Sequence, residues 1–134
     1  MRRMIFAVLG ILVLAAGSVR GHHGYAAFFQ PTERTVLVEG DLESLVYANP
    51  HVVMKIRAAD STLYTVSWQA PGWVQRAAGV TRTTFKIGDH LMVVGAPSRD
   101  PASHDVTLVR EVRRPRDGWS WRSNALFAQP SSLG

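Results

Sequence analysis

The sequence predicts a small all-β domain with one short helix. Between residues 35 and 112, apolar and polar residues alternate in short runs, which is the period of strands buried on one face. Turn-forming pairs separate these runs: Asn49-Pro50, Asp60-Ser61 and Pro71-Gly72. A single stretch, Trp73 to Ala78, has helical spacing, and it lies between the third and the fourth expected strands.

The first expected strand begins at Thr35 and is unusually long. Alternation places four aliphatic residues on one of its faces, namely Val36, Val38, Leu42 and Val46. Three carboxylates share the opposite face, namely Glu39, Asp41 and Glu43. Gly40 lies where a bulge would bend so long a strand.

Further apolar sets indicate the remaining strands: Val52, Met54 and Ile56; Tyr64, Val66 and Trp68; Leu91 to Val94; and Val106, Leu108 and Val112. The helix is short, with Trp73 and Ala77 spaced to touch the same surface, and Gly79 ends it. Five strands with a helix between the third and the fourth are the layout of a five-stranded OB-like small barrel, the oligonucleotide/oligosaccharide-binding arrangement. A small open sandwich is the structural alternative.

Residues 1–21 have the three-part pattern of a secretory signal peptide, with two arginines, an apolar run over residues 4–16 and then mostly small residues. As a helix, the apolar run covers only about 20 Å, short of the roughly 30 Å hydrocarbon core of a membrane. We therefore expect a bacterial periplasmic or secreted protein with no transmembrane anchor after processing. Three cleavage points fit the small residues: after Gly17, Ser18 or Gly21. The last of them would make His22 the first residue.

The expected organisation is a signal peptide over residues 1–21, the OB-like barrel over residues 22–112 and an Arg/Trp-containing C-terminal tail over residues 113–134. The 134-residue chain has a net charge of +5 and a pI near 10.4, which suggests nucleic-acid binding. Residues 22–109, however, hold 7 basic and 8 acidic residues, so the basicity belongs to the export signal and the tail. We therefore expect no nucleic-acid partner. The absence of cysteine excludes disulfides, iron–sulfur clusters and thiolate metal sites.

Three stretches of the chain occur together in a recognisable order. They are His22-His23-Gly24-Tyr25-Ala26-Ala27, Asn49-Pro50-His51-Val52, and a later run containing Trp68, Pro71, Gly79, Phe85 and Gly88-Asp89. Together they resemble a family of small exported bacterial proteins described as a domain of unknown function, DUF6152. The resemblance covers about residues 22–112 and implies an exported, compact, mostly β domain with no established activity.

Histidines are the side chains best suited to hold a metal ion in this chain. If His22 is the first residue of the processed protein, its amine and ring nitrogen can chelate one metal ion. An imidazole from elsewhere in the chain would complete a set of three nitrogen ligands. Such ligands favour copper over calcium or magnesium. His51 is the best partner, because it lies opposite the apolar stripe of its strand and next to a turn. The segment before the first strand reaches roughly 40 Å when extended, enough to return to that turn. The hypothesis is a copper site of His22, His23 and His51, with His23 as third ligand or as support. The alternative is an exposed terminus and a His51 that hydrogen-bonds its own loop.

The motifs of common enzyme classes are missing from the sequence, including Gly-x-Ser-x-Gly, phosphate-binding glycine loops and His-Glu-x-x-His. A row of carboxylates could serve acid–base chemistry, but such a row is more often a solvated strand face, so we expect no enzyme. The main hypothesis is a periplasmic binding module for copper.

The alternative function is a cell-envelope interaction module that uses the basic and aromatic tail without metal. Trp119 and Trp121 lie among arginines there, and they would contact a partner protein or an anionic surface. An amphipathic strand or short hairpin that covers the barrel is another interpretation of the same segment. We expect His90 and His104 to be solvated surface residues.

Overall fold

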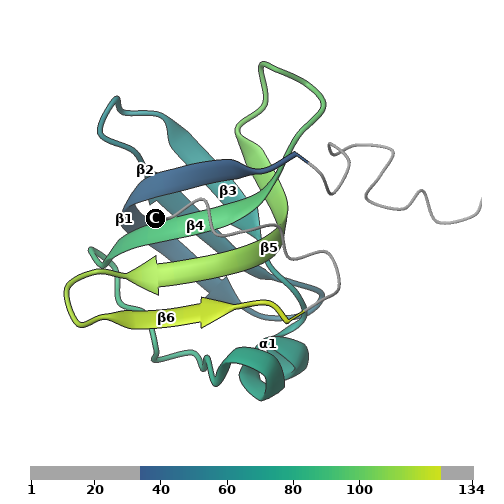
Figure 1. Ribbon diagram of the computed structural model, residues 1–134, viewed down its shortest axis with the longest axis vertical. Helices are drawn as coiled ribbons and strands as arrows, with labels where there is room; N and C mark the ends of the chain where they lie inside the picture. The colour runs from purple at the N-terminus through teal and green to yellow at the C-terminus, as the bar shows by residue number, and fades with distance from the viewer. Residues whose placement is uncertain (1–33, 125–134) are drawn as a thin grey trace, which may run out of the picture.

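The computed structural model describes residues 34–124, and over this range the fold is mostly β with one short helix, as predicted. The elements follow in the order β1 (Val36–Tyr47), β2 (Val52–Arg57), β3 (Leu63–Ser67), α1 (Pro71–Ala78), β4 (His90–Pro97), β5 (Asp105–Arg114) and β6 (Trp119–Arg122) (Figure 1). In this part of the chain, no helix is long and apolar enough to cross a membrane.

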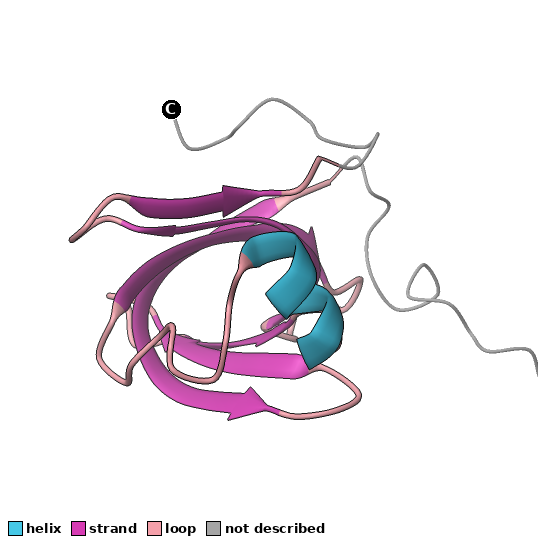
Figure 2. Ribbon diagram, turned by 90° about the horizontal axis from the view of Figure 1, so that it is seen from below, coloured by secondary structure: helices cyan, strands magenta, loops and turns pink. Residues whose placement is uncertain are grey.

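The first five strands close into a barrel. Neighbouring strands pair in the order β3-β2-β1-β4-β5-β6, and β3 also pairs with β5, which joins the two sides of the sheet. The β3–β5 contact is parallel and the other pairs are antiparallel, so the barrel is mixed. Figure 2 shows the strands curving around one axis, with α1 across one end. The OB-like barrel is confirmed, and the open sandwich does not form.

Strand β1 is bent enough to pair with two neighbours. Its first half pairs with β4 and its second half with β2. Gly40 lies directly before the change of partner, where a Cβ atom would overlap the carbonyl oxygen of Arg57. The bulge itself lies further along, where the register shifts between Leu42 and Ser44. Gly40 therefore allows a close backbone approach, and the bend is completed after it.

The bulge reverses the alternation of side chains in the second half of β1. Val46, predicted on the core face, is 52% exposed, whereas Leu45 and Tyr47 pack against the core. One extra residue on one strand turns the later side chains to the opposite face. The prediction for Val46 is therefore wrong, and that for Val38 and Leu42, which precede the bulge, is confirmed.

The core occupies the inside of the barrel and reaches α1. Aliphatic side chains dominate it, and burying each of them stabilises the fold by roughly 1.5–3 kcal/mol. Its members are Val38, Leu42, Val52, Met54, Ile56, Val66, Trp68, Val74, Val80, Phe85, Leu91, Val93, Val106, Val109 and Val112. Since the chain has no cysteine, this packing and the strand ladders hold the barrel without a covalent cross-link.

Helix α1 begins at Pro71, slightly earlier than predicted, and ends before Gly79, as predicted. Proline suits the first turn of a helix, and Gly79 has a φ of 67°, the left-handed conformation that commonly ends one. Val74 is the buried residue of the helix. The hydroxyl of Tyr47 lies 3.1 Å from the carbonyl oxygen of Pro71 and 2.9 Å from that of Val80, so β1 is tied to both ends of α1.

Replacing Gly40 by alanine tests the close approach of β1 to the end of β2. The added methyl group would overlap backbone atoms, which cannot rotate away. We expect the free energy of unfolding to fall by about 3 kcal/mol, the upper end for an overpacked site. Urea unfolding followed by tryptophan fluorescence measures this loss.

Gly72→Ala is the matched control for this experiment. A Cβ atom at position 72 meets the flexible end of the Arg76 side chain at 3.4 Å. Because alanine also favours the helix over glycine, we expect no loss of stability. Equal losses in the two variants would contradict the role given to Gly40.

Candidate functional site

His51 lies immediately before β2, where the chain leaves the turn that follows β1. The peptide bond between Asn49 and Pro50 in this turn is cis. The imidazole is half-buried, and its Nδ1 lies 3.0 Å from the carbonyl oxygen of Trp68, in the segment after β3. The ring is therefore anchored to a neighbouring segment of the barrel and does not hydrogen-bond its own loop through this nitrogen.

The contact with Trp68 determines which ring nitrogen of His51 can bind a metal. A carbonyl oxygen only accepts, so Nδ1 donates its N–H and the lone pair of the neutral ring lies on Nε2. Metal-binding histidines are commonly oriented in this way by a backbone carbonyl. The carbonyl is itself well fixed, because the N–H of Trp68 donates to the oxygen of Val52 at 2.8 Å and the N–H of Val52 donates to the oxygen of Gln69 at 3.0 Å.

His22 and His23 lie outside the described residues, so their place beside His51 stays a prediction. Within residues 34–124, no group of three or more His, Asp or Glu side chains is arranged to hold a metal ion. The described part of the chain thus contributes His51 to the predicted ligand set and holds no complete site of its own.

His90 and His104 both have defined contacts. At the start of β4, Nδ1 of His90 lies 2.8 Å from Asp41 Oδ1 and Nε2 lies 3.1 Å from Glu39 Oε1. The hydrogen bonds with Asp41 and with Glu39 raise the pKa of His90, because the protonated ring can donate to both carboxylates. His104 packs edge-on against the ring of Tyr64 at 5.5 Å. Both histidine side chains are exposed, as predicted. His90 is more than a solvated residue, however, because it pairs with two carboxylates on the neighbouring strand β1.

The third carboxylate of the row on β1, Glu43, pairs with Arg57 on β2. Arg57 donates from Nε and from its terminal nitrogen to the two carboxylate oxygens, at 2.7 and 2.9 Å. This hydrogen bonding is the main reason that the pKa of Glu43 lies below its usual value. The carboxylates of the row therefore face cationic or protonatable side chains across the sheet, which is the usual arrangement of stabilising cross-strand pairs.

Residues 113–122 of the Arg/Trp-containing segment complete β5 and form β6. The two strands pair antiparallel, so this segment is a hairpin attached to the barrel. The ring of Trp121 lies 5.0 Å from that of Trp68 and 6.1 Å from that of Trp73. Its Nε1 donates to the carbonyl oxygen of Ala77 at 3.0 Å. The helical spacing predicts that Trp73 and Ala77 contact the same surface, and this surface is the indole of Trp121.

A buried ion pair joins the hairpin to the loop before β4. Arg114 donates to Asp89 Oδ2 at 3.2 Å and to the carbonyl oxygen of Thr84 at 2.6 Å. Asp117 accepts from Arg114 at 2.9 Å on the outer side. The guanidinium lies 5.6 Å from the centre of the Phe85 ring, close enough for a cation–π contact. In the sequence Asp89 stands out only as part of a motif, because nothing in the residue pattern pairs it with an arginine 25 residues later.

Asp89 stays ionised in spite of its burial. Burial alone would raise its pKa, but the N–H of Lys86, the guanidinium of Arg114 and the charge of Arg116 outweigh that effect, and the pKa lies below its usual value. Breaking such a buried pair costs more than the pair itself contributes, because the remaining charge stays buried. The pair therefore fixes the hairpin against the barrel.

A groove of about 340 Å³ borders the same hairpin. Met92, Pro115 and Trp119 supply apolar lining, and Arg113 and Arg114 supply charge. Arg113 donates to Glu111 at 3.0 Å, which partly neutralises it. The groove has the size of a small-ligand site.

The strand order and the one short helix define a small closed β-barrel protein. The chain belongs to a family of unknown function, DUF6152, whose family model matches residues 10–107, and this confirms the resemblance seen in the sequence. The match spans the His22-His23 pair and His51 and ends within β5, before the hairpin turn. Neither the curated proteins nor the solved structures gave a match.

The cluster around His90 predicts a pH-dependent stability. Because the pKa of His90 is raised in the folded state, its contribution is complete below the unfolded value of about 6.5 and is lost as the pH rises through the raised value. The free energy of unfolding of the wild type should exceed that of His90→Gln at pH 6, and the difference should shrink by pH 9. Since the side chains are about half exposed, we expect less than about 1 kcal/mol.

The control for this measurement repeats the comparison of His90 with His90→Gln after both carboxylate partners have been removed. In a Glu39→Gln, Asp41→Asn background, adding His90→Gln should cause no further pH-dependent change, since neither amide favours the protonated ring. A wild-type difference that is the same at both pH values would contradict this assignment.

Proposed function

We propose that this protein is an exported, non-enzymatic binding module that holds one copper ion. The ligands are the amine and ring of His22 and Nε2 of His51, with His23 as third ligand or as support. The observation that carries this proposal is the 3.0 Å contact between His51 Nδ1 and the carbonyl oxygen of Trp68. It orients the ring and puts the coordinating lone pair on Nε2.

Two further observations support this site over other parts of the molecule. The family match contains all three histidines, whereas residues 113–122 of the hairpin lie beyond its end. The described chain starts at residue 34, close to the beginning of β1, so about a dozen residues separate His22 from the barrel. Extended, they reach roughly 40 Å, about the length of the 12-residue strand β1, at whose far end the turn beside His51 lies.

The chemistry of the proposed ligands favours copper. An amine and imidazole nitrogens are ligands of intermediate softness, and copper(II) binds them more tightly than the other divalent ions of its row. Export is part of the same proposal, because cleavage after Gly21 is the step that would create the chelating amine of His22. Binding without catalysis is supported by the pairing of the carboxylates on β1 with His90 and Arg57.

The proposal predicts both the start of the secreted protein and its copper affinity. Intact-mass analysis should give His22 as the first residue. Titration with copper(II), followed by electron spin resonance, should show one site with nitrogen ligands. His51→Ala removes a proposed ligand and should weaken binding by at least roughly 10- to 100-fold, the loss seen when only a group that supports a ligand is removed.

His104→Ala is the matched control, because it removes an exposed imidazole that packs on Tyr64 and leaves the proposed ligands in place. Its copper affinity should equal that of the wild type. A different first residue, or an unchanged affinity in His51→Ala, would overturn the copper site.

The second candidate is a cell-envelope interaction module that uses the hairpin without metal. It is supported by the exposure of the Arg116 and Arg122 side chains, 58% and 46%, beside the groove at Trp119. Their carboxylate partners, Asp89 and Glu111, reduce the net charge of this surface, which is why copper binding ranks first.

Anionic vesicles test this second candidate directly. An Arg116→Ser, Arg122→Ser variant should lose at least about tenfold in binding to phosphatidylglycerol vesicles at low salt, because charge attraction of this kind is screened by salt. An Arg76→Ser, Arg82→Ser variant removes equal charge elsewhere and should bind as the wild type does. Equal binding by all three proteins would remove the hairpin from the function.

A further inference from the structure

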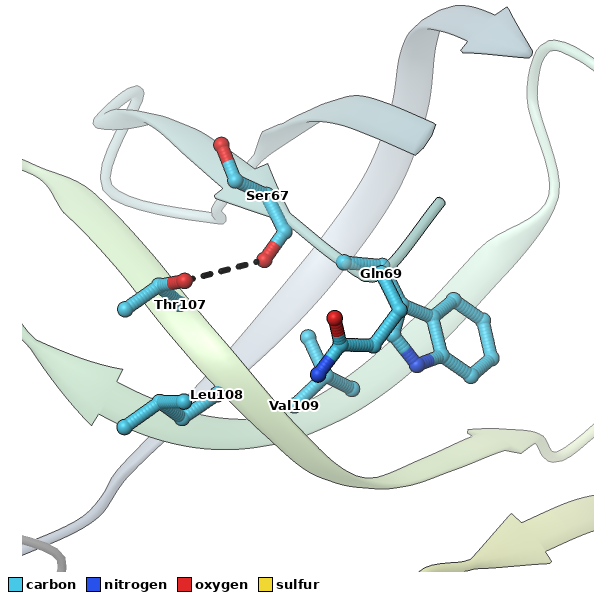
Figure 3. Close-up of a pocket in the computed structure, with 6 residues that line it drawn as sticks. Ser67, Gln69, Thr107, Leu108 and Val109 are labelled. Atoms are coloured by element: carbon cyan, nitrogen blue, oxygen red, sulfur yellow. Dashed lines mark hydrogen bonds between the residues drawn. The ribbon is translucent and has the colours of Figure 1, made fainter. Parts of the chain in front are cut away.

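Two cavities in the described part of the chain differ greatly in size. One lies at the seam of β3 and β5, where Figure 3 shows the hydroxyl of Thr107 donating to the carbonyl oxygen of Ser67, and its volume is about 10 Å³. That space holds at most one water molecule. The groove beside the β5–β6 hairpin has about 340 Å³ and falls within the range of small-ligand sites, roughly 300–1,000 Å³. Of these two, the hairpin groove alone can hold an organic ligand.

A row of three side chains on neighbouring strands lines the hairpin groove. Met92 of β4 is paired with Arg113 of β5, and Arg113 is paired with Ser120 of β6. Figure 1 shows these three strands side by side. Residues directly opposite each other on antiparallel strands project from the same face, with Cβ atoms about 4.5–5.5 Å apart. The register therefore brings an apolar, a cationic and a hydroxyl-bearing residue together.

Arg113 keeps most of its hydrogen-bond donors available in this row. Its Nε donates to Oε1 of Glu111 at 3.0 Å, and within residues 34–124 its two terminal nitrogens have no acceptor. The side chain of Glu111 is only 6% exposed, so it anchors the guanidinium from the barrel side of the pair. Two parallel N–H groups of a guanidinium match the two oxygens of a carboxylate. Arg113 can therefore bind a carboxylate without losing Glu111.

The charges beside the groove leave an excess of one positive charge. Among residues 34–124, the ion pairs there join four arginines to three carboxylates. They are Arg113 and Arg122 with Glu111, Arg114 and Arg116 with Asp89, and Arg114 with Asp117. One carboxylate would balance this excess, whereas a phosphate monoester carries about −1.5 to −2 at neutral pH and would exceed it.

The rest of the groove is apolar and fixed in place. Met92, Pro115 and Trp119 supply the apolar lining. The ring of Trp119 packs edge-on against that of Phe85 at 5.1 Å, and its backbone N–H donates to Asp117 at 3.2 Å. A groove formed in advance needs little ordering when a ligand enters, and the unbranched side chain of Met92 can adjust to the shape of the ligand.

We propose that the hairpin groove binds a small organic monocarboxylate with an apolar body. The carboxylate accepts from the two terminal nitrogens of Arg113, and the body lies against Met92, Pro115 and Trp119. Simple aromatic and aliphatic carboxylic acids combine these two features. None of the lining residues is a proposed copper ligand, so this site is independent of the copper site.

Titration of the copper-free secreted protein, labelled in its methionine methyl groups, tests the site by nuclear magnetic resonance. Phenylacetate and hexanoate supply an aromatic and an aliphatic body, and phenylacetamide and hexanamide are their neutral counterparts. At least one acid should shift the Met92 signal saturably, while the signal of Met54, which is buried in the core, stays unchanged. That acid should bind at least about tenfold more tightly than its amide, which lacks the charge-assisted hydrogen bonds. No saturation by either acid below about 10 mM, or equal binding of acid and amide, would overturn the proposal.

Arg113→Gln tests the residue that recognises the carboxylate. This variant should bind the acid at least about tenfold more weakly and the amide as before. Arg76→Gln removes the same charge from α1, outside the groove, and should bind the acid as the wild type does. Equal affinity in the two variants would overturn the proposal, and the comparison of acid with amide in the wild type decides if Arg113→Gln does not fold. His51→Ala should bind the acid as the wild type does, so this site and the copper site can fail separately.

Discussion

The parallel contact between β3 and β5 turns a curved sheet into a barrel. It consists of two residue pairs, Thr65 with Asp105 and Val66 with Val106. Closure at this point leaves few open edges for unwanted pairing and encloses one apolar core. It also fixes the segment after β3, where Trp68 contacts His51 through its carbonyl oxygen and Trp121 through its ring. The candidate metal ligand and the covering hairpin therefore both depend on how the barrel closes.

Two other constraints make this closure possible. Gly40 lets β1 approach the end of β2, and Gly95 lets β4 approach β5, where a Cβ atom would lie 2.6 Å from the carbonyl oxygen of Thr107. The buried pair of Asp89 and Arg114 then joins the loop before β4 to the hairpin. A buried ion pair contributes little net stability, but it tolerates few alternative arrangements. It is thus better understood as fixing the position of β6 than as a source of stability.

The fold class follows from local signals, because alternation, turn pairs and a short helical stretch need no knowledge of distant residues. The bulge after Leu42 leaves no such signal, and so the burial predicted for Val46 fails. The candidate site is likewise only partly predictable from the sequence. The sequence shows His51 beside a turn, but its partner is a backbone carbonyl group, which every residue carries and no composition reveals. The sequence also gives no sign of the pairing of Asp89 with Arg114, because the two residues come together only when the barrel closes.

We propose that Nε2 of His51 binds copper while Nδ1 donates to the carbonyl oxygen of Trp68. Electron spin echo modulation detects the remote nitrogen of a coordinated imidazole, so it reports directly on which ring nitrogen of His51 is bound to copper. The copper-loaded secreted protein should show modulation from a remote Nδ1 that carries a hydrogen bond, and His51→Gln should lose that component. An identical modulation pattern in the two proteins would exclude His51 as a copper ligand.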